Sequence, residues 1–279
     1  MKNYTLDNIN TKVRSIIEGE IHNLNKEEVY KKILELIDLT TLEATDNDSK
    51  VLDLCRKAYS LSNLNIGINC VAAVCVYPVF VATAKKALSE KNIKIAAVAG
   101  GFPSGQMPLH LRLDEVRYAV EQGADEIDMV ISRGKFLTGD YDFIYEEIEK
   151  HKNACCKAHL KVILETGELE TPENIKKASE IAIEAGADFI KTSTGKISPA
   201  ATLEASYVML NVIKDYYEKT GKKTGFKPAG GISTPEVALE YYILVKYILG
   251  NEWLQPNLFR FGASRLFDAI LSKLIPNHF

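Results

Sequence analysis

Eight short apolar segments alternate with eight amphipathic segments along most of the chain, and this alternation limits the fold more than any other feature. The apolar, β-branched segments predict strands at 36–42, 70–77, 94–100, 126–132, 160–166, 189–194, 224–229 and 258–262. Helical spacing of apolar residues predicts helices at 50–63, 78–90, 109–123, 142–157, 172–186, 200–219, 235–249 and 264–274. Strict alternation of this kind is typical of an α/β domain whose parallel strands close into a (β/α)₈ TIM barrel.

The main alternative to a closed barrel is a doubly wound open sheet. That fold is disfavoured because no Gly-x-Gly-x-x-Gly motif follows the first predicted strand. No linker or low-complexity segment interrupts the series of units. Two further helices are predicted at 7–18 and 26–35. We therefore expect an N-terminal helical extension over residues 1–35 that caps the barrel, followed by one barrel domain over 36–279.

Composition excludes several classes of partner. The formal net charge is −3 over 279 residues, so the chain offers no basic field for nucleic acid or for an anionic membrane surface. The first residues lack the apolar core of a signal peptide, and no apolar run approaches about 18 residues, so we expect a cytoplasmic protein. The five cysteines form no Cys-x-x-Cys pair, and no histidine lies at the spacing of a metal ligand from them. We expect reduced thiols and no metal site.

Charged residues occupy the face of the strands that should point into the barrel. Successive side chains on a strand point to opposite faces. We take Lys191 as inward and the apolar residues of the other strands as facing the helices, and the remaining side chains then point into the barrel. It holds Cys75 and Thr40 together with three lysines and four carboxylates: Lys161, Lys191, Lys227, Asp38, Glu126, Asp128 and Glu165. Buried charges are costly unless paired, so this many in one lumen favours chemistry over a purely structural ion network.

Two of these lysines suggest what the chemistry is. Lys191 lies within a short β-branched run, and Lys227 has a similar setting in the next predicted strand. An ammonium about 4 Å away at an effective ε of about 20 contributes about 4 kcal/mol, or about 3 pKa units, towards deprotonation. A deprotonated lysine is an amine nucleophile. Carboxylates such as Asp38 act in the opposite sense, so the net shift is left open at this stage.

Glycine-rich segments follow the last three predicted strands, where many barrels bind phosphate. Tight turns alone would also explain glycines, but their joint position after consecutive strands favours a phosphate cup. The predicted phosphate-binding residues are Gly195, Lys196, Gly230, Gly231, Gly262 and Ser264.

At eight places the chain resembles the deoxyribose-phosphate aldolase family. The matching motifs are DLTTL (38–42), VCVYP (74–78), GFPSG (101–105), GADEID (123–128), ETGEL (165–169), FIKTSTGK (189–196), GFKPAGG (225–231) and FGAS (261–264). The resemblance implies a class I aldolase that reversibly cleaves 2-deoxy-D-ribose 5-phosphate to D-glyceraldehyde 3-phosphate and acetaldehyde, without a metal or organic cofactor. It also implies a small phosphorylated sugar as the substrate partner. Barrels of this type often form dimers, so we expect a homodimer.

The resemblance assigns roles to the lumen residues. Lys191 matches the Schiff-base lysine, Lys227 its activating partner, and Asp128 the carboxylate that moves protons through a water. Four further residues are expected in supporting positions: Asp38, Lys161, Cys75 and Thr40. For Cys75, a small buried filler and capture of the substrate aldehyde both remain open.

Two departures from the family pattern limit these assignments. Some family members end in a tyrosine on a flexible tail that assists proton transfer, whereas this chain ends in Phe279. Arg265 follows Ser264 where small hydroxyl residues are common, and we expect its side chain to project to solvent. Two other functions are compatible with a Schiff-base lysine or a phosphate cup, namely a pyridoxal-phosphate barrel enzyme and a non-catalytic sugar-phosphate sensor.

Overall fold

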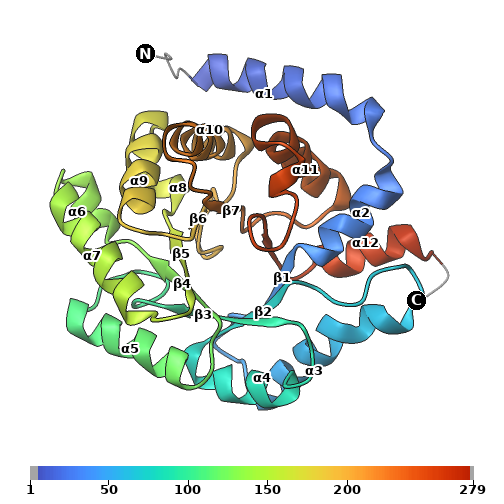
Figure 1. The fold of residues 1–279 in the computed structure, drawn as a ribbon, viewed down its shortest axis with the longest axis horizontal. Helices are drawn as coiled ribbons and strands as arrows, with labels where there is room; N and C mark the ends of the chain where they lie inside the picture. The colour runs from blue at the N-terminus through green and yellow to red at the C-terminus, as the bar shows by residue number, and fades with distance from the viewer. Residues whose placement is uncertain (1–5, 277–279) are drawn as a thin grey trace.

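A single parallel sheet forms the centre of the molecule (Figure 1). The computed structural model describes residues 6–276, so Phe279 and the expectation attached to it lie outside the described residues. Within that range the sheet has eight strands, in the order β7-β6-β5-β4-β3-β2-β1-β8. Bridges from Phe226 to Phe259 and from Ala229 to Gly262 join the two ends, so the sheet is a nearly closed barrel. The strands are β1 (Ile37–Thr40), β2 (Ala73–Val76), β3 (Lys94–Ala99), β4 (Glu126–Val130), β5 (His159–Ile163), β6 (Phe189–Lys191), β7 (Gly225–Lys227) and β8 (Phe261–Ala263).

Helices surround the barrel and connect consecutive strands (Figure 1). The α-helices are α1 (Leu6–Glu20), α2 (Lys26–Glu35), α3 (Asp48–Tyr59), α4 (Val81–Ala87), α5 (Leu109–Glu121), α6 (Arg133–Leu137), α7 (Tyr141–Ala154), α8 (Thr166–Leu169), α9 (Pro172–Glu184), α10 (Leu203–Thr220), α11 (Pro235–Leu249) and α12 (Leu266–Leu274). Short 3₁₀ helices are η1 (Ile21–Asn23), η2 (Ser60–Asn63), η3 (Pro78–Phe80) and η4 (Asn251–Trp253). None of the helices in this range is long and apolar enough to cross a membrane.

Local sequence explains where several helices begin. The hydroxyl groups of Thr171, Thr202 and Thr234 accept hydrogen bonds from backbone N–H groups in the first turns of α9, α10 and α11. Such caps satisfy donors that have no partner inside the helix. Pro172 and Pro235 occupy the first helical position, where a missing N–H costs nothing. These caps define where α9, α10 and α11 begin and therefore where the preceding βα loops end.

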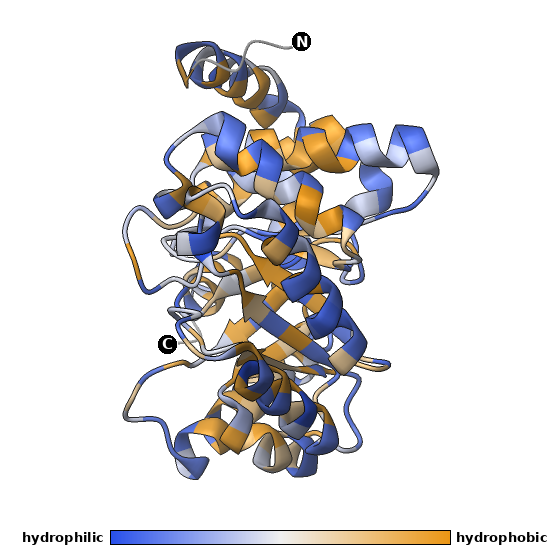
Figure 2. Ribbon diagram, turned by 90° about the vertical axis from the view of Figure 1, so that its left-hand side faces the viewer, coloured by the Kyte–Doolittle hydropathy of each residue, from blue (hydrophilic) through white to orange (hydrophobic). Residues whose placement is uncertain are grey.

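The main apolar core fills the space between strands and helices. Strand side chains such as Ile127, Met129 and Val162 are fully buried in this layer. Figure 2 shows the central strands largely in the hydrophobic colour, with helices of mixed character around them. Apolar burial on the helix side of the strands leaves the lumen side free for polar residues, as the alternation predicted.

The N-terminal helices lie against the outer ring. Helix α1 packs on α10 and α11, and α2 packs on α11 and α12, as Figure 1 shows at the edge of the ring. The buried residues of α1, among them Ile9 and Val13, belong to the main core. The separation of residues 1–35 from the barrel, and their capping role, stay a prediction.

The predicted (β/α)₈ barrel is confirmed, and the differences occur at the ends of elements. The strand predicted at 160–166 ends at Ile163, and Glu165 has the left-handed φ of 56° before α8 begins. The short helices α6 and α8 within the loops were not predicted. The helix predicted from residue 200 begins at Leu203, where Thr202 caps it. The strongly periodic elements were thus predictable, whereas short loop helices carry too few residues for a periodic signal.

Candidate active site

Lys191, Lys227 and Asp128 meet inside the barrel. Lys191 on β6 lies beside Lys227 on β7 in the sheet register. The Nζ atoms of Lys191 and Lys227 both donate to Oδ2 of Asp128, at 2.7 Å and 2.6 Å. All three side chains are buried. The three residues predicted to be catalytic therefore share one carboxylate oxygen.

The other charged groups extend this cluster on the same side of the strands. Lys227 Nζ also donates to Oδ2 of Asp38 at 2.5 Å, and Lys161 Nζ donates to Asp128 Oδ1 at 3.2 Å and to Glu126. Lys161 Nζ lies 3.8 Å from Asp38 Oδ2. The predicted supporting residues Asp38 and Lys161 are thus in direct contact with residues predicted to be catalytic.

Arg260, which the sequence analysis missed, completes the cluster. Its guanidinium donates to Asp38 Oδ1 at 2.5 Å and to Glu126 Oε1 at 2.7 Å, and it is 1% exposed. The signal was available in the sequence, because Arg260 alternates with the apolar residues Phe259 and Phe261 in the strand predicted at 258–262. The alternation that sorted the other strands would have placed Arg260 inward as well.

Glu165, unlike Arg260, was predicted to lie in the lumen and does not join the cluster. It was expected to face the lumen with Lys161, but the chain leaves the strand geometry before it. Its carboxylate accepts a hydrogen bond from the Thr194 hydroxyl and forms an ion pair with Arg133 at 3.2 Å. The two-residue alternation does not extend past the end of β5, so Glu165 holds the loop after β6 instead of joining the lysines.

The charge count of the cluster identifies Lys191 as the group that can be neutral. Four cationic side chains, Lys161, Lys191, Lys227 and Arg260, face three carboxylates, those of Asp38, Glu126 and Asp128. Within the described residues Lys191 pairs with one carboxylate, while each of the other cations pairs with two or more. Buried charge is stabilised by balance, so loss of the proton on Lys191 leaves three cations opposite three anions.

The pKa shifts agree with this count. Burial lowers the pKa of Lys191 below its ordinary value; Asp128 opposes this shift, and Lys227 adds to it. Burial also acts to lower the pKa of Lys227, but Asp128 and Asp38 outweigh it and raise that pKa. The charge of Lys227 therefore adds to the lowering of the Lys191 pKa, but burial has the larger effect. An activating role for Lys227 stays a prediction.

Asp128 remains ionised between the lysines. Burial alone would raise the pKa of its carboxyl, but Lys161, Lys191 and Lys227 outweigh burial and hold the pKa well below its ordinary value. An ionised carboxylate in contact with Lys191 can accept a proton, directly or through a water.

Thr40 and Cys75 lie beside the cluster without joining it. The Thr40 hydroxyl donates to the carbonyl of Asp38 at 2.8 Å. Cys75 packs in a small apolar group with Leu42 and Val98. Burial raises the pKa of the Cys75 thiol to about 11, so the thiol is neutral at pH 7. A neutral thiol is a poor nucleophile, which favours the filler role.

The glycine-rich loops form one cavity above the cluster. A cavity of about 510 Å³ lies between the loops after β1, β6, β7 and β8, and Lys191 contributes to its wall. Thr40 and Arg265 line this cavity. So do all six predicted phosphate-binding residues: Gly195, Lys196, Gly230, Gly231, Gly262 and Ser264. The structure thus brings the predicted lysine and the predicted phosphate cup into one pocket.

Backbone geometry explains two of the glycines. Gly230 has a φ of 83°, and a Cβ on it would lie 2.6 Å from the Cβ of Ala200. Gly231 has a φ of 80°, with no atom within 4 Å of such a Cβ. Both conformations are strained for other residues. Gly230 is therefore required by close packing, whereas at Gly231 the backbone itself borders open space in the cup.

The charged residues of the cup differ in their contacts. Lys196 Nζ lies 3.1 Å from Glu43 across the cavity. Arg265 occupies the N-cap position of α12 without a side-chain cap, and it is exposed. The expectation that Arg265 points away from a bound phosphate stays a prediction. Among residues 6–276, no three His, Cys, Asp or Glu side chains are grouped so that they could hold a metal ion.

Comparison with known proteins gives one consistent family. The profile of DeoC/LacD family aldolases matches residues 32–240. The deoxyribose-phosphate aldolase of Homo sapiens is 52% identical over 250 residues, which are 86% of this chain and 78% of the human protein.

Solved structures show the same fold. The structure described as "QR15, an Aldolase" is 29% identical, with a TM-score of 0.70 over 88% of this chain and 99% of that one. The deoxyribose-phosphate aldolase from Aeropyrum pernix, described as having a unique tetrameric structure, is 23% identical, with a TM-score of 0.71 over 94% of this chain and 98% of that one.

Proposed function

The chain belongs to the DeoC/LacD family of aldolases, and from this premise we propose that it reversibly cleaves 2-deoxy-D-ribose 5-phosphate to D-glyceraldehyde 3-phosphate and acetaldehyde. We infer that Lys191 forms the Schiff base. One observation carries this assignment: in a buried cluster of four cations and three carboxylates, Lys191 contacts one carboxylate, whereas Lys161 and Lys227 each contact two or more. The direction of the pKa shift of Lys191, which is downward, agrees with this count. The same lysine lines the cavity that can hold the substrate.

The reaction begins with the neutral amine of Lys191. Its lone pair attacks the aldehyde carbon C1, and a proton passes to the oxygen to give a carbinolamine. Loss of water, with a second proton added to the departing oxygen, leaves an iminium. Asp128 is placed to take and return these protons because its carboxylate contacts Lys191 Nζ directly. The role of Lys227 is to keep positive charge beside Lys191 and so to disfavour its ammonium form.

The iminium then serves as the electron sink for cleavage. The C3 hydroxyl loses its proton, the C2–C3 bond breaks, and its electron pair forms the enamine of acetaldehyde on Lys191. Glyceraldehyde 3-phosphate leaves with C3 as its new aldehyde carbon. Protonation of the enamine at C2 and addition of water release acetaldehyde and restore the amine.

The cup would hold the phosphate end of this substrate. Gly231 and Ser264 line the cavity, and Ser264 directly precedes Arg265, the N-cap residue of α12. Free N–H groups and the dipole at a helix N-terminus favour an anion. Substrate held there would direct its aldehyde end towards Lys191, which lines the same cavity.

Borohydride trapping tests the assignment of Lys191. Incubation with acetaldehyde followed by reduction should leave an ethyl group on the peptide that bears Lys191, found by mass spectrometry of a digest. Lys191→Arg should abolish the label while other lysines stay unmodified. A label on Lys161 or Lys227 in the wild-type protein would disprove the assignment, and absence of any label would disprove the Schiff-base route.

We further propose that the enzyme acts in the cytoplasm as a homodimer. All five cysteines are free, which suits a reducing compartment. Large apolar side chains are exposed on the neighbouring helices α5 and α7, including Leu111, Tyr118 and Tyr145. A second copy of the chain could cover them. Light scattering after size exclusion should give twice the chain mass, and Tyr118→Glu should shift the species towards monomer.

A further inference from the structure

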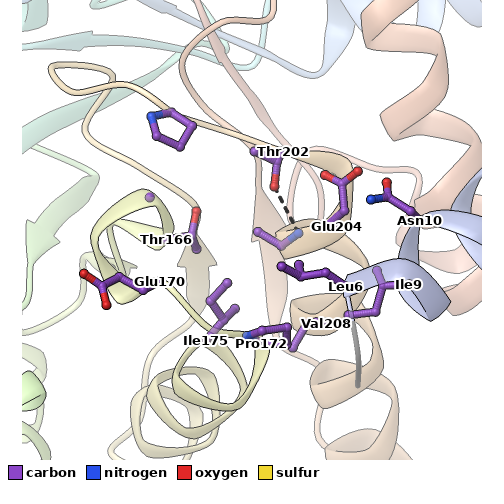
Figure 3. A pocket seen from close by; sticks show the side chains of 13 residues that line it. Leu6, Ile9, Asn10, Thr166, Glu170, Pro172, Ile175, Thr202, Glu204 and Val208 are labelled. Atoms are coloured by element: carbon purple, nitrogen blue, oxygen red, sulfur yellow. Dashed lines mark hydrogen bonds between the residues drawn. The ribbon is translucent and has the colours of Figure 1, made fainter. Parts of the chain in front are cut away.

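A short segment at the start of α8, residues 165–167, lies directly against the loop after β6. The Thr166 N–H donates to the Thr192 carbonyl at 2.9 Å. A Cβ on Gly167 would lie 2.1 Å from the carbonyl oxygen of Pro199, so only glycine allows this close approach. Figure 3 shows Thr166 beside the short helix α8, whose first residue it is. The start of α8 therefore supports the loop after β6 along its length.

Glu165 is the residue of this segment that holds the loop with its side chain. Its carboxylate accepts hydrogen bonds from the Thr194 backbone N–H, at 3.2 Å, and from the Thr194 hydroxyl. Glu165 is 0% exposed, and its φ of 56° is uncommon for a residue other than glycine. Strained backbone conformations persist only where surrounding contacts compensate for them, and they cluster at functional sites. The backbone of Glu165 is thus strained at the point where its carboxylate meets Thr194.

Arg133 binds the same carboxylate from the other side. Its Nη1 lies 3.2 Å from Glu165 Oε2, and its Nε lies 2.7 Å from Glu168 Oε2. The guanidinium also donates to two carbonyls in the loop after β3. Burial raises the pKa of the Glu165 carboxyl, and Thr194 and Arg133 act against this rise. The Glu165 carboxylate is therefore shared between a fixed arginine and the loop after β6.

Thr194 connects Glu165 to the phosphate cup. The Thr194 hydroxyl accepts a hydrogen bond from the Lys196 N–H at 3.1 Å, and both residues line the catalytic cavity. At the other edge of the loop, the Ser193 hydroxyl donates to the Ala229 carbonyl at 2.6 Å. The loop after β6 is thus held between Glu165 and the loop after β7, and its position sets where Lys196 enters the cavity.

We propose that Glu165 is a positioning residue for the phosphate end of the substrate, because it acts through Thr194 to hold the loop that carries Lys196 in the cup. Glu165 does not line the cavity, so this role needs no contact with the substrate. Its carboxylate binds Thr194 and Arg133, which lie outside the lumen cluster. The inference rests on the proposed function, since it assigns the cup to the phosphate of deoxyribose 5-phosphate.

Kinetics with two substrates test this role. A hydrogen bond to a charged group is worth roughly 10- to 150-fold in an equilibrium, so Glu165→Gln should raise KM for deoxyribose 5-phosphate by about tenfold and change kcat by less than about twofold. The ratio of kcat/KM for deoxyribose 5-phosphate to kcat/KM for unphosphorylated deoxyribose should fall to the same extent. Glu168→Gln is the matched control, because it neutralises the other carboxylate that pairs with Arg133, and it should leave this ratio unchanged.

Variants of Thr194 test the route of the effect. Thr194→Val removes the hydroxyl and should raise KM as Glu165→Gln does, whereas Thr194→Ser keeps the hydroxyl and should retain the wild-type KM. Because both changes act on one contact, the double variant should lose no more than the weaker of the two single variants. Borohydride labelling of Lys191 with acetaldehyde, which carries no phosphate, shows that the barrel is intact. If Glu165→Gln does not fold, the two Thr194 variants still test the route.

Titration calorimetry with inorganic phosphate separates a failure of this inference from a failure of the proposed function. Binding of phosphate needs no turnover, so a wild-type protein that binds phosphate without cleaving deoxyribose 5-phosphate would contradict the proposed function alone. Phosphate should bind Glu165→Gln about tenfold more weakly than it binds the wild-type protein. Three results would each overturn the proposal: no phosphate binding to the wild-type protein, unchanged phosphate affinity in both Glu165→Gln and Thr194→Val, or equal losses of kcat/KM for the two substrates.

Discussion

At the scale of single residues, the proposed mechanism depends on which lysine loses its proton. Lys191 holds one carboxylate, whereas Lys227 holds Asp38 and Asp128. The same residue type therefore has opposite pKa shifts on neighbouring strands. Of these two buried lysines, the one with fewer carboxylates within contact distance has the lowered pKa.

Lys227→Leu should move the rising limb of the pH–rate profile to higher pH. The variant lacks one cation, so Lys191 in its charged form now balances the carboxylates and its pKa rises. Activity requires neutral Lys191 and therefore appears at higher pH. The measurement is kcat/KM for deoxyribose 5-phosphate as a function of pH.

Asp128→Asn is a control that should move the rising limb of the pH–rate profile in the opposite direction. Removal of this anion disfavours the charged form of Lys191, so the rising limb should move to lower pH while kcat falls by about 10²- to 10⁴-fold through loss of the proton carrier. Lys223→Leu, outside the lumen, should change neither quantity. If the rising limb moved the same way in the Lys227 and Asp128 variants, charge balance would not govern Lys191.

Ser264 and Arg265 test the phosphate cup. Ser264→Ala should lower kcat/KM for deoxyribose 5-phosphate and leave unphosphorylated deoxyribose unaffected, because the hydroxyl and the start of α12 serve the anion. Arg265→Ser should matter much less if the guanidinium stays in solvent. A direct charge-assisted bond would be worth roughly 10- to 150-fold in binding. A tenfold or larger loss confined to the phosphorylated substrate in Arg265→Ser would show that Arg265 contacts the phosphate.

At the scale of elements, a buried ion pair joins α5 and α7 to the ends of two strands. Arg112 on α5 pairs with Glu147 on α7, and both are at most 1% exposed. Arg112 also donates to the carbonyls of Gly100, after β3, at 2.6 Å and of Val130, on β4, at 2.7 Å. Since β4 carries Asp128, this pair holds the strand end next to the Asp128 carboxylate.

Glu147→Gln should therefore destabilise the protein strongly. The substitution leaves the Arg112 charge buried without its anion, which typically costs about 3–5 kcal/mol. Asp114→Asn breaks the exposed pair with Arg117 on the same helix and should cost within about 1 kcal/mol. Urea unfolding followed by circular dichroism measures both. Similar midpoints for the two variants would contradict an anchoring role for the buried pair.

At the scale of the whole molecule, the barrel is built around ions that must remain charged. Burial opposes the charge on Asp38, Glu126 and Asp128, but lysines and Arg260 outweigh it and lower all three pKa values. Carboxyl groups whose pKa is lower in the folded state stabilise it above their unfolded pKa of about 4, and this contribution is lost as pH falls through the folded pKa.

The free energy of unfolding should accordingly fall as pH is lowered from about 5 towards about 2. Asp38→Asn should be less stable than the wild-type protein at pH 7, and its stability should depend less on pH in this range because one titrating group is gone. Denaturant unfolding at several pH values tests this. Parallel curves for the two proteins would mean that Asp38 does not contribute to acid lability.

The eight βα units and the inward face of most strands could be read from the sequence. Alternation is a local property, so it placed Asp38, Asp128, Lys191 and Lys227 in the lumen without knowledge of the fold. Local spacing also located the glycines after the last three strands, and their loops line one cavity in the structure.

Closure of the barrel decided the rest. Glu165 left the lumen because its strand ended early, and closure paired the inward Arg260 with Glu126, 134 residues away in sequence. Contacts of such separation depend on strand register and on where each strand stops, which no local pattern encodes. The lowered pKa of Lys191 belongs to this second group. It follows from the sum of charges that only the folded barrel brings together, in a space where burial makes any unbalanced charge costly.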